Sequence, residues 1–271
     1  DRRITSFTTR QGLSNDAINA IMEDRDGSLW VGARGGVNRL RDGSFDSFTT
    51  REGLSSEFVF SIHEDREGSL WIGTGGGGLN RLRDGRLTPW TTKEGLTNDF
   101  ARSFAEGNDG TLWIGTDGGG LNRLKDGRIA AITTKQGLSN DFVERVLEDS
   151  RGVLWIGTSG GGLNRMQDGK LTAFTTRQGL ANNDVVSICE DRDGSLWIGT
   201  RGGLSRLKGG RITSLTVRDG LTNDVVRALH QDREGALWIG TEGGGLNRLK
   251  DGRITAFTTA SGLSSDNIVS I

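Results

Sequence analysis

The segment WIGTGGGGLNRL, which begins at Trp71, has the glycine spacing of a phosphate-binding loop. Gly73, Gly75 and Gly78 satisfy the pattern G-x-G-x-x-G, in which glycines let the backbone approach a pyrophosphate at the start of a helix. Here the loop leads into LNRL, a short strand-like run that an Asp-Gly pair ends, so no helix start is available to hold a phosphate. We therefore expect a backbone turn at this position and no cofactor.

Acidic, histidine and cysteine residues offer other chemistry. The string DRDG at 24–27 and 191–194 resembles the start of a calcium loop, but the later oxygen ligands are missing, which favours a hairpin turn. His63 and His230 occupy the same repeat position in separate units, and no spacing of Cys or His is typical of a metal site. Cys189 has no partner His or Asn that the sequence places beside it. We expect neither catalytic residues nor metal ligands.

A repeat of about 42 residues positions all of these groups. The segment Leu-Trp-Ile/Val-Gly recurs six times, and successive tryptophans are 41 or 42 residues apart. Their identical placement in each unit indicates packing between units rather than ligand stacking. These tryptophans are Trp30, Trp71, Trp113, Trp155, Trp197 and Trp238.

One unit contains four strand-like segments and no major helix. In residues 17–50 the segments are AINAIMED, LWVGA, VNRL and SFDSFTT, at 17–24, 29–33, 37–40 and 44–50. Asp-Gly pairs separate the first from the second and the third from the fourth, and Asp-Gly is a strong signal for a tight hairpin. Four antiparallel strands per unit, repeated six times, predict a β-propeller, with a solenoid as the less favoured alternative.

The predicted fold is a single all-β propeller domain over residues 1–271. It has six complete repeats and the terminal strands of a seventh, because the chain opens on the fourth-strand segment RITSFTT and closes on the inner-strand segment DNIVSI. We expect a seven-bladed ring and keep a six-bladed ring as the alternative. The predicted repeats are 3–43, 44–85, 86–127, 128–169, 170–210 and 211–252, with a partial repeat at 253–271.

Composition excludes several classes of protein. The chain has 271 residues with a formal net charge of −1, so nothing favours nucleic acid or an anionic membrane as a partner. No apolar run approaches the roughly 20 residues that span a bilayer, and no signal peptide is visible. The 44 glycines do not follow a collagen period.

The repeats resemble a known family. GLSNDAINAIMEDRDGSLWVGARGGVNRL and its copies are similar to the two-component regulator propeller repeat, which forms the sensor region of bacterial hybrid histidine kinases. The resemblance implies a periplasmic or extracytoplasmic ligand-sensing module, in many members for glycans. It also implies that kinase activity, and any homodimer formed through signalling parts, belongs to segments other than this one.

In a close repeat, functional asymmetry must lie where the copies differ. One variable position, just before the glycine run, holds Arg34, Asp117, Arg201 and Glu242 in four of the units. The third residue of the inner strand varies as well, and so does the first, which is Phe58, Phe100 and Phe142 in three units. We expect these positions to surround the channel mouth and to bind a small polar molecule or oligosaccharide. The candidate residues of the third inner-strand position are Phe60, Arg102, Glu144 and Arg227.

Three functions remain open at this point. The first is a sensor module that binds a ligand at the mouth. The second is a lectin-like or protein-interaction scaffold without a signalling role, which a designed or recently amplified sequence would also fit. The third and least favoured is a propeller lyase or hydrolase, because no unit has an acid, base or metal cluster that the others lack. Arg102 and Glu144 are the nearest catalytic candidates, and a salt bridge would explain them equally well.

Overall fold

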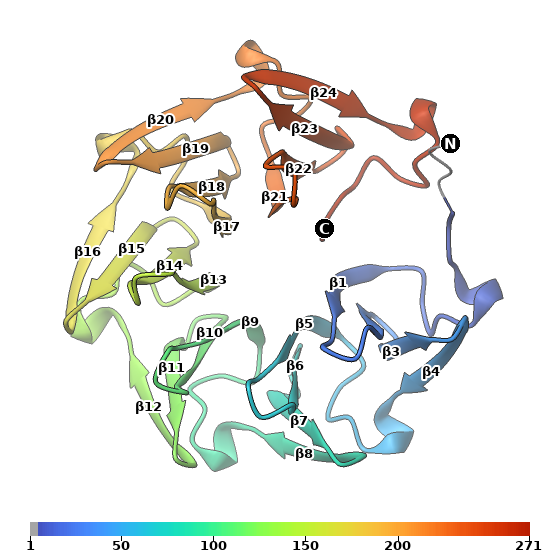
Figure 1. Ribbon diagram of the computed structural model, residues 1–271. Helices are drawn as coiled ribbons and strands as arrows, with labels where there is room; N and C mark the ends of the chain where they lie inside the picture. Colours follow the sequence, from blue (N-terminus) through green and yellow to red (C-terminus); the bar gives the residue numbers. More distant parts are fainter. Residues whose placement is uncertain (1–4) are drawn as a thin grey trace. The chain divides into compact units, whose positions relative to one another are not determined.

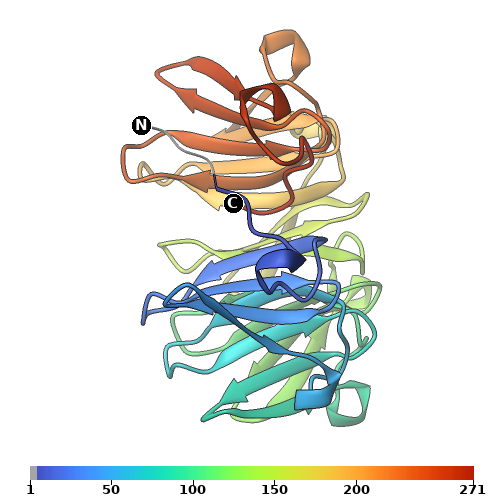
Figure 2. The same ribbon diagram turned by 90° about the vertical axis from the view of Figure 1, so that its right-hand side faces the viewer.

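The chain folds into four-stranded antiparallel sheets, each of which we call a blade. The computed structural model describes residues 5–271 and contains six blades, numbered 1 to 6 in chain order. Within every blade the strands pair in the order in which they occur in the chain (Figure 1; from the side, Figure 2). The prediction of an all-β fold with four antiparallel strands per unit is confirmed.

The chain divides into two compact units, each of three blades. The unit of blades 1 to 3 contains residues 6–136 and 141–143. Its strands are β1 (Ile18–Glu23), β2 (Leu29–Ala33), β3 (Gly36–Arg41), β4 (Ser44–Phe48), β5 (Val59–Glu64), β6 (Leu70–Thr74), β7 (Leu79–Arg83), β8 (Arg86–Trp90), β9 (Ala101–Glu106), β10 (Leu112–Thr116), β11 (Gly120–Lys125) and β12 (Arg128–Ile132).

The second unit contains blades 4 to 6. It comprises residues 137–140 and 144–271, together with residue 5 among the described part of the chain. Its strands are β13 (Val143–Glu148), β14 (Leu154–Thr158), β15 (Gly162–Gln167), β16 (Lys170–Phe174), β17 (Val185–Glu190), β18 (Leu196–Thr200), β19 (Gly203–Lys208), β20 (Arg211–Leu215), β21 (Val226–Gln231), β22 (Leu237–Thr241), β23 (Leu246–Lys250) and β24 (Arg253–Phe257).

The hairpins that join third and fourth strands have the expected turn. At Asp42 and Gly43 the φ angles are 50° and 81°, both in the left-handed region that a type I′ turn requires. Gly209 and Gly210 adopt the same conformation in blade 5, with φ of 55° and 81°. These turns fix the register of each blade, and Trp71 consequently pairs with Arg81 on the neighbouring strand.

The first hairpin of each blade is a longer turn, and in five of the blades it also anchors the tryptophan. In blade 2, Asp65 Oδ1 accepts the N–H groups of Glu67 and Ser69, while only Gly68 at the tip has a positive φ. Asp65 Oδ2 accepts the indole N–H of Trp71 at 2.7 Å. The DRDG string is therefore a turn whose first carboxylate satisfies a buried indole.

Between blades the chain makes short 3₁₀ helices that the sequence did not predict. In η2, the Thr49 side chain caps the turn and Glu52 Oε2 accepts the Thr49 N–H at 2.8 Å, and Gly53 ends the turn with φ of 98°. Because Thr49 is a cap, β4 ends at Phe48 rather than continuing to residue 50 as expected. The seven turns are η1 (Thr9–Gln11), η2 (Thr50–Glu52), η3 (Thr92–Glu94), η4 (Thr134–Gln136), η5 (Thr176–Gln178), η6 (Val217–Asp219) and η7 (Thr259–Ser261).

The core lies between adjacent blades of one unit. Trp155 of blade 4 packs with Val185 and Leu196 of blade 5 in one buried cluster. The glycine two residues after the tryptophan lets the next inner strand approach closely, since a Cβ on Gly157 would lie 2.6 Å from Val185 Cγ1. This Trp-x-Gly arrangement explains why the tryptophan and the glycine recur in every blade.

A side-chain clasp also links neighbouring blades. Glu64 is the last residue of the inner strand β5. Its Oε2 atom accepts the backbone N–H of Arg25, which lies in the first hairpin of the preceding blade, at 2.9 Å. Glu106 accepts from Arg66 at 3.0 Å in the same way. In the second unit, Gln231 accepts from Arg192 at 2.9 Å.

The seventh blade expected from the terminal segments is not formed by the described residues. Six blades are present, and residues 5–8 and 262–271 add no strand to them. The expectation of seven blades is wrong, and the six-bladed alternative is correct. Residues 3 and 4 of the segment RITSFTT, which also open the first predicted repeat, lie outside the described residues.

The closing segment shows why it adds no sheet. Ile268 donates its N–H to the Thr241 carbonyl at 3.0 Å and packs on Gly240, where a Cβ would lie 2.7 Å from Ile268 Cγ2. Val226 packs on Gly199 with the same 2.7 Å spacing, so the segment occupies the place of a next inner strand (Figure 1, red, ending at C). Among residues 5–271 no second strand pairs with it, and without a ladder it forms no blade.

Candidate ligand-binding sites

The variable positions predicted to read a ligand meet inside each blade. The residue before the glycine run donates its N–H to the carbonyl of the first variable inner-strand position, as Asp117 does to Phe100 at 3.1 Å. Glu242 and Val225 are joined likewise at 3.0 Å in blade 6. We call this end of each blade, formed by the second loop and the start of the inner strand, the loop edge.

In two blades the predicted residues neutralise each other. Arg102 Nη2 lies 2.6 Å from Asp117 Oδ2. The exposed fraction of the side chain is 31% for Arg102 and 24% for Asp117. Arg227 and Glu242 stand at the same two positions in blade 6 and are also 2.6 Å apart. These residues were chosen separately from the sequence, and the structure makes them partners within one blade.

Phe60 and Gly75 occupy the same two positions in blade 2. A Cβ on Gly75 would lie 2.8 Å from Phe60 Cε2, so the phenylalanine ring fills the space that a side chain at 75 would need. The Arg102 guanidinium lies 5.0 Å from the centroid of the Phe60 ring, within cation–π range. The glycine run that resembles a phosphate loop is therefore a turn that leaves room for Phe60.

The other three predicted residues have different surroundings. Arg34 in blade 1 and Arg201 in blade 5 are exposed at their loop edges. Glu144 is half-buried on β13, in the second unit, whereas Arg102 belongs to the first unit. Arg102, the nearest catalytic candidate together with Glu144, makes an ion pair with Asp117 of its own blade.

Three phenylalanines at the loop edges of the first unit are exposed to solvent. Phe58, Phe100 and Phe142 have exposed fractions of 52%, 43% and 50%. The Phe142 ring lies over the preceding blade's loop, because a Cβ on Gly118 would be 3.4 Å from Phe142 Cζ. Large apolar side chains that stay exposed beside a charged pair are typical of binding surfaces.

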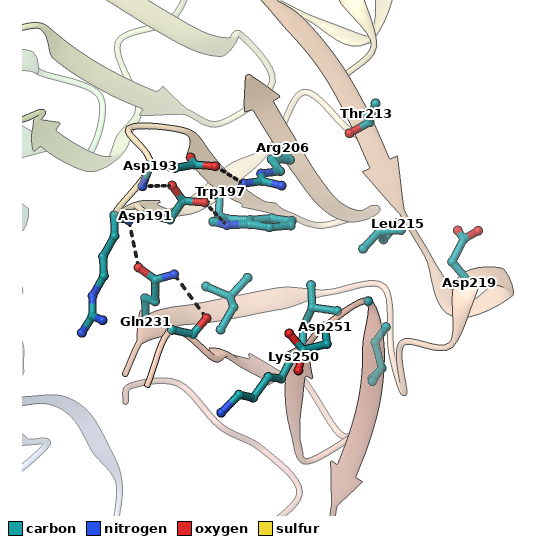
Figure 3. A pocket seen from close by; sticks show the side chains of 16 residues that line it. Asp191, Asp193, Trp197, Arg206, Thr213, Leu215, Asp219, Gln231, Lys250 and Asp251 are labelled. Atoms are coloured by element: carbon teal, nitrogen blue, oxygen red, sulfur yellow. Dashed lines mark hydrogen bonds and ion pairs between the residues drawn. The ribbon is translucent and has the colours of Figure 1, made fainter. Parts of the chain in front are cut away.

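The opposite end of the blades, where the first and third hairpins lie, carries a cleft that the sequence did not predict. It lies between blades 5 and 6 and has a volume of about 570 Å³ (Figure 3). Trp197 and Leu215 line it from blade 5, and Leu237 and Ile254 line it from blade 6. Carboxylates from both blades stand among the lining residues, Asp219 from η6 and Asp251 from the turn after β23.

Sister clefts in the same chain are smaller. The cleft between blades 4 and 5 measures about 320 Å³ and contains Phe174, and the cleft between blades 2 and 3 measures about 270 Å³ and contains Trp90. Leu215 stands at the same repeat position. Because leucine is smaller than phenylalanine or tryptophan, Leu215 contributes to the greater width of the cleft between blades 5 and 6.

Polar groups hold the walls of this cleft in place. The Arg206 guanidinium lies 4.9 Å from the Trp197 ring and donates to Asp191 and Asp193, each at 2.9 Å. In the next blade, the hydrogen bond from the Trp238 indole is the largest cause that lowers the pKa of Asp232 below its usual value. Asp191 and Asp232 each accept the indole N–H of the tryptophan in their own blade, at 3.1 and 2.8 Å, and so fix the two rings.

The sequence carries a signal for this cleft at the end of the fourth strand. The last residue of the fourth strand is aromatic in four blades and leucine at Leu215. The variable positions predicted to bind a ligand lie at the loop edge and not along the outer strand, so the prediction did not include this cleft.

Neither a metal cluster nor a membrane helix occurs in the part of the chain that the structure describes. No three His, Cys, Asp or Glu side chains in residues 5–271 are grouped so that they could hold a metal ion. No helix within these residues has both the length and the apolar character needed to cross a bilayer.

Comparison with protein families decides the affiliation of the chain. Six segments match the two component regulator propeller model, and together they cover more than half of the sequence; they are residues 12–35, 53–76, 95–118, 137–160, 179–202 and 220–243. This chain belongs to the two component regulator propeller family. Each matched segment begins at the glycine that follows a 3₁₀ turn and ends in the loop edge. The family resemblance read from the sequence is confirmed.

Solved structures show where this propeller fold recurs. The extracellular domain assigned to the hybrid two component system BT3049 of B. thetaiotaomicron matches with a TM-score of 0.55 at 23% identity, over 98% of this chain and 48% of that chain. A virginiamycin B lyase from Staphylococcus aureus with quinupristin matches with a TM-score of 0.76 at 18% identity, over 92% and 86%.

A third structure matches over about half of its length. PorZ, a surface component of the type-IX secretion system of Porphyromonas gingivalis, has a TM-score of 0.74 at 15% identity, over 98% of this chain and 45% of that chain. At such identities the likeness shows the fold alone. A search of curated proteins found no match to this chain.

Proposed function

We propose that this chain is the ligand-sensing module of a bacterial two-component signal-transduction regulator and works outside the cytoplasm. Family membership supports the signalling role, and the extracellular domain of BT3049 shares the fold. The proposed ligand is a small polar or glycan-like molecule, bound at the loop edges of the first unit.

One arrangement carries the binding proposal. Arg102 joins Phe60 and Asp117 at a loop edge, while Phe100 and Phe142 stay exposed at the same edge of this unit. Aromatic faces pack against the C–H faces of a sugar ring, and a charged pair offers donors and acceptors to its hydroxyl groups. Arg34 and Arg201, exposed at other loop edges, and Glu144, Arg227 and Glu242 belong to the proposed ligand-reading positions of their own blades.

The test uses residues that sister blades already tolerate. Phe100→Ala copies Ala17, and Arg102→Asn copies Asn19, so both variants are expected to fold. We would titrate the full chain with cellotetraose, xylotetraose and maltotetraose by calorimetry. The proposal expects one of these to bind and both variants to weaken that binding about tenfold or more. As a matched control, Val217→Thr changes an exposed apolar residue on η6 to the threonine of sister repeats and should have no effect.

A scaffold that binds proteins is the second candidate, because exposed phenylalanines also mark protein interfaces. If no oligosaccharide binds and Phe100→Ala abolishes capture of a defined partner protein, the sensor proposal fails in favour of the scaffold. We propose no enzymatic role. Incubation with quinupristin, the compound present with the lyase neighbour, should leave it intact, and its conversion would overturn that view.

A further inference from the structure

The cleft between blades 5 and 6 has the size and lining of a small-molecule site. Its volume of about 570 Å³ falls within the range usual for ligand pockets. Leu215 and Trp197 form one apolar wall, and Leu237 and Ile254 form the other. A ligand with an apolar body would bury its surface against both walls.

Two carboxylates that are not bound to a basic side chain of the lining stand at separate places along the cleft. Asp219 ends η6 in blade 5, and Asp251 lies in the turn between β23 and β24 of blade 6 (Figure 3). Asp219 uses Oδ2 to accept the N–H and the hydroxyl of Thr216, at 2.9 and 3.1 Å. Its carboxylate is thereby held in place at the edge of the cleft.

Most of the positive charge along the cleft is already matched. Arg206 is bound to Asp191 and Asp193, and Lys250 lies 3.3 Å from Glu234, outside the cleft lining. Arg192 is the remaining basic residue of the lining, against the two carboxylates of Asp219 and Asp251. The open part of the cleft therefore carries an excess of negative charge, which favours a cation.

We propose that this cleft binds an organic cation with a flat or branched apolar body, of the arylalkylamine class. The apolar body lies between the leucine and isoleucine side chains of the two walls, and the ammonium group pairs with one of the two carboxylates, Asp219 or Asp251. This site is separate from the loop edge and does not rest on the function proposed above.

The sister cleft between blades 4 and 5 supplies matched substitutions. Phe174 stands there in place of Leu215, Gln178 in place of Asp219 and Gly209 in place of Asp251. Gln178 makes the same cap as Asp219, and Gly209 has the same left-handed turn as Asp251. Each substitution taken from that cleft should therefore preserve the blade.

The experiment titrates the full chain with tryptamine by calorimetry and compares indole-3-propionate, an anion of similar shape. We expect saturable binding of tryptamine, about tenfold or more tighter than that of the anion. Leu215→Phe should weaken tryptamine binding about tenfold by filling the cleft, and the double variant Asp219→Gln, Asp251→Gly should remove the preference for the cation. Far-UV circular dichroism and thermal unfolding of each variant check that the blade is intact.

Three results would overturn the proposal: no saturable binding of tryptamine, equal binding of cation and anion, or wild-type binding by both variants. The double variant keeps the test decisive if Leu215→Phe does not fold. Oligosaccharide binding at the loop edge should be unchanged in either variant, so failure here is distinguishable from failure of the sensor proposal.

Discussion

Arg102 Nη2 lies 2.6 Å from Asp117 Oδ2 across one blade, and the pair recurs as Arg227 and Glu242 three blades later. The third inner-strand residue and the residue before the glycine run therefore act as a matched pair of positions. Where the first is arginine the second is acidic, and where the first is Phe60 the second is a glycine that makes room for the ring.

The matched positions predict a rescue in blade 2. Gly75→Arg should destabilise the protein by about 1–3 kcal/mol, because the new Cβ would lie 2.8 Å from the Phe60 ring. The double variant Phe60→Val, Gly75→Arg copies Val186 and Arg201 of blade 5 and should recover most of the loss. Urea unfolding of the single and double variants measures both effects. Equal instability of Gly75→Arg with and without Phe60→Val would contradict the pairing.

The Arg102 and Asp117 ion pair predicts a modest coupling energy. Both side chains are partly exposed, so solvent screens the attraction, and we expect a coupling of about 0.5–1 kcal/mol. A double-mutant cycle with Arg102→Ala and Asp117→Ala measures it by chemical unfolding. The equivalent cycle at Arg227 and Glu242 should give a similar value, and additive single effects would show that the two charges do not cooperate.

His63 predicts a dependence of stability on pH. Burial lowers the pKa of His63 below its ordinary value of 6.5 and outweighs the attraction of Glu106, 4.0 Å away, and of Asp65 and Glu64. The folded state thus disfavours the charged imidazole. The neutral imidazole therefore makes its full contribution to the free energy of unfolding above pH 6.5, and this contribution falls as the pH drops through 6.5 toward the lower pKa of the folded state.

The measurement is the free energy of unfolding of wild type and His63→Gln between about pH 8 and about pH 5. As the pH falls, wild type should lose more free energy of unfolding than His63→Gln. His230→Gln changes the exposed histidine at the same repeat position and serves as the control. A pH-independent difference for His63→Gln would refute the assignment.

Blade 3 lacks the carboxylate that anchors the tryptophan elsewhere. Gly107 stands where Asp65 binds Trp71, although the turn is the same, with Gly107 N–H on the Thr111 carbonyl at 2.7 Å. Gly107→Asp should give Trp113 an acceptor and raise stability by about 1 kcal/mol. Thermal unfolding should show a gain beyond that of Gly107→Ala, which corrects for the flexibility of glycine. No gain over alanine would mean that the indole N–H is already satisfied by water.

The sequence predicted the blades well because their determinants are local. Asp42-Gly43 and its copies permit one tight turn, and the spacing from Trp30 to Trp71 sets the repeat. The 3₁₀ turns were missed because Thr49 was read as the end of a strand, although its hydroxyl caps the following turn. The blade number was wrong because a strand-like segment such as 266–271 needs a neighbour before it becomes a strand.

Prediction of the candidate sites was less complete because side-chain pairing depends on three-dimensional neighbours. The loop-edge positions were found as variable residues, but their pairing within a blade, such as Arg227 with Glu242, appears only when the strands are aligned. The cleft at Leu215 was missed because a leucine in an outer strand looks like ordinary packing until its aromatic counterparts are compared.

The clasp that joins Glu64 to the Arg25 N–H has a mechanical consequence. Within each unit, an inner strand thus holds the first hairpin of the blade before it, so a rotation of that strand would move the hairpin as well. A molecule that rotates an inner strand at the loop edge would therefore displace a hairpin at the far end of the neighbouring blade, the end at which the cleft beside Trp197 opens.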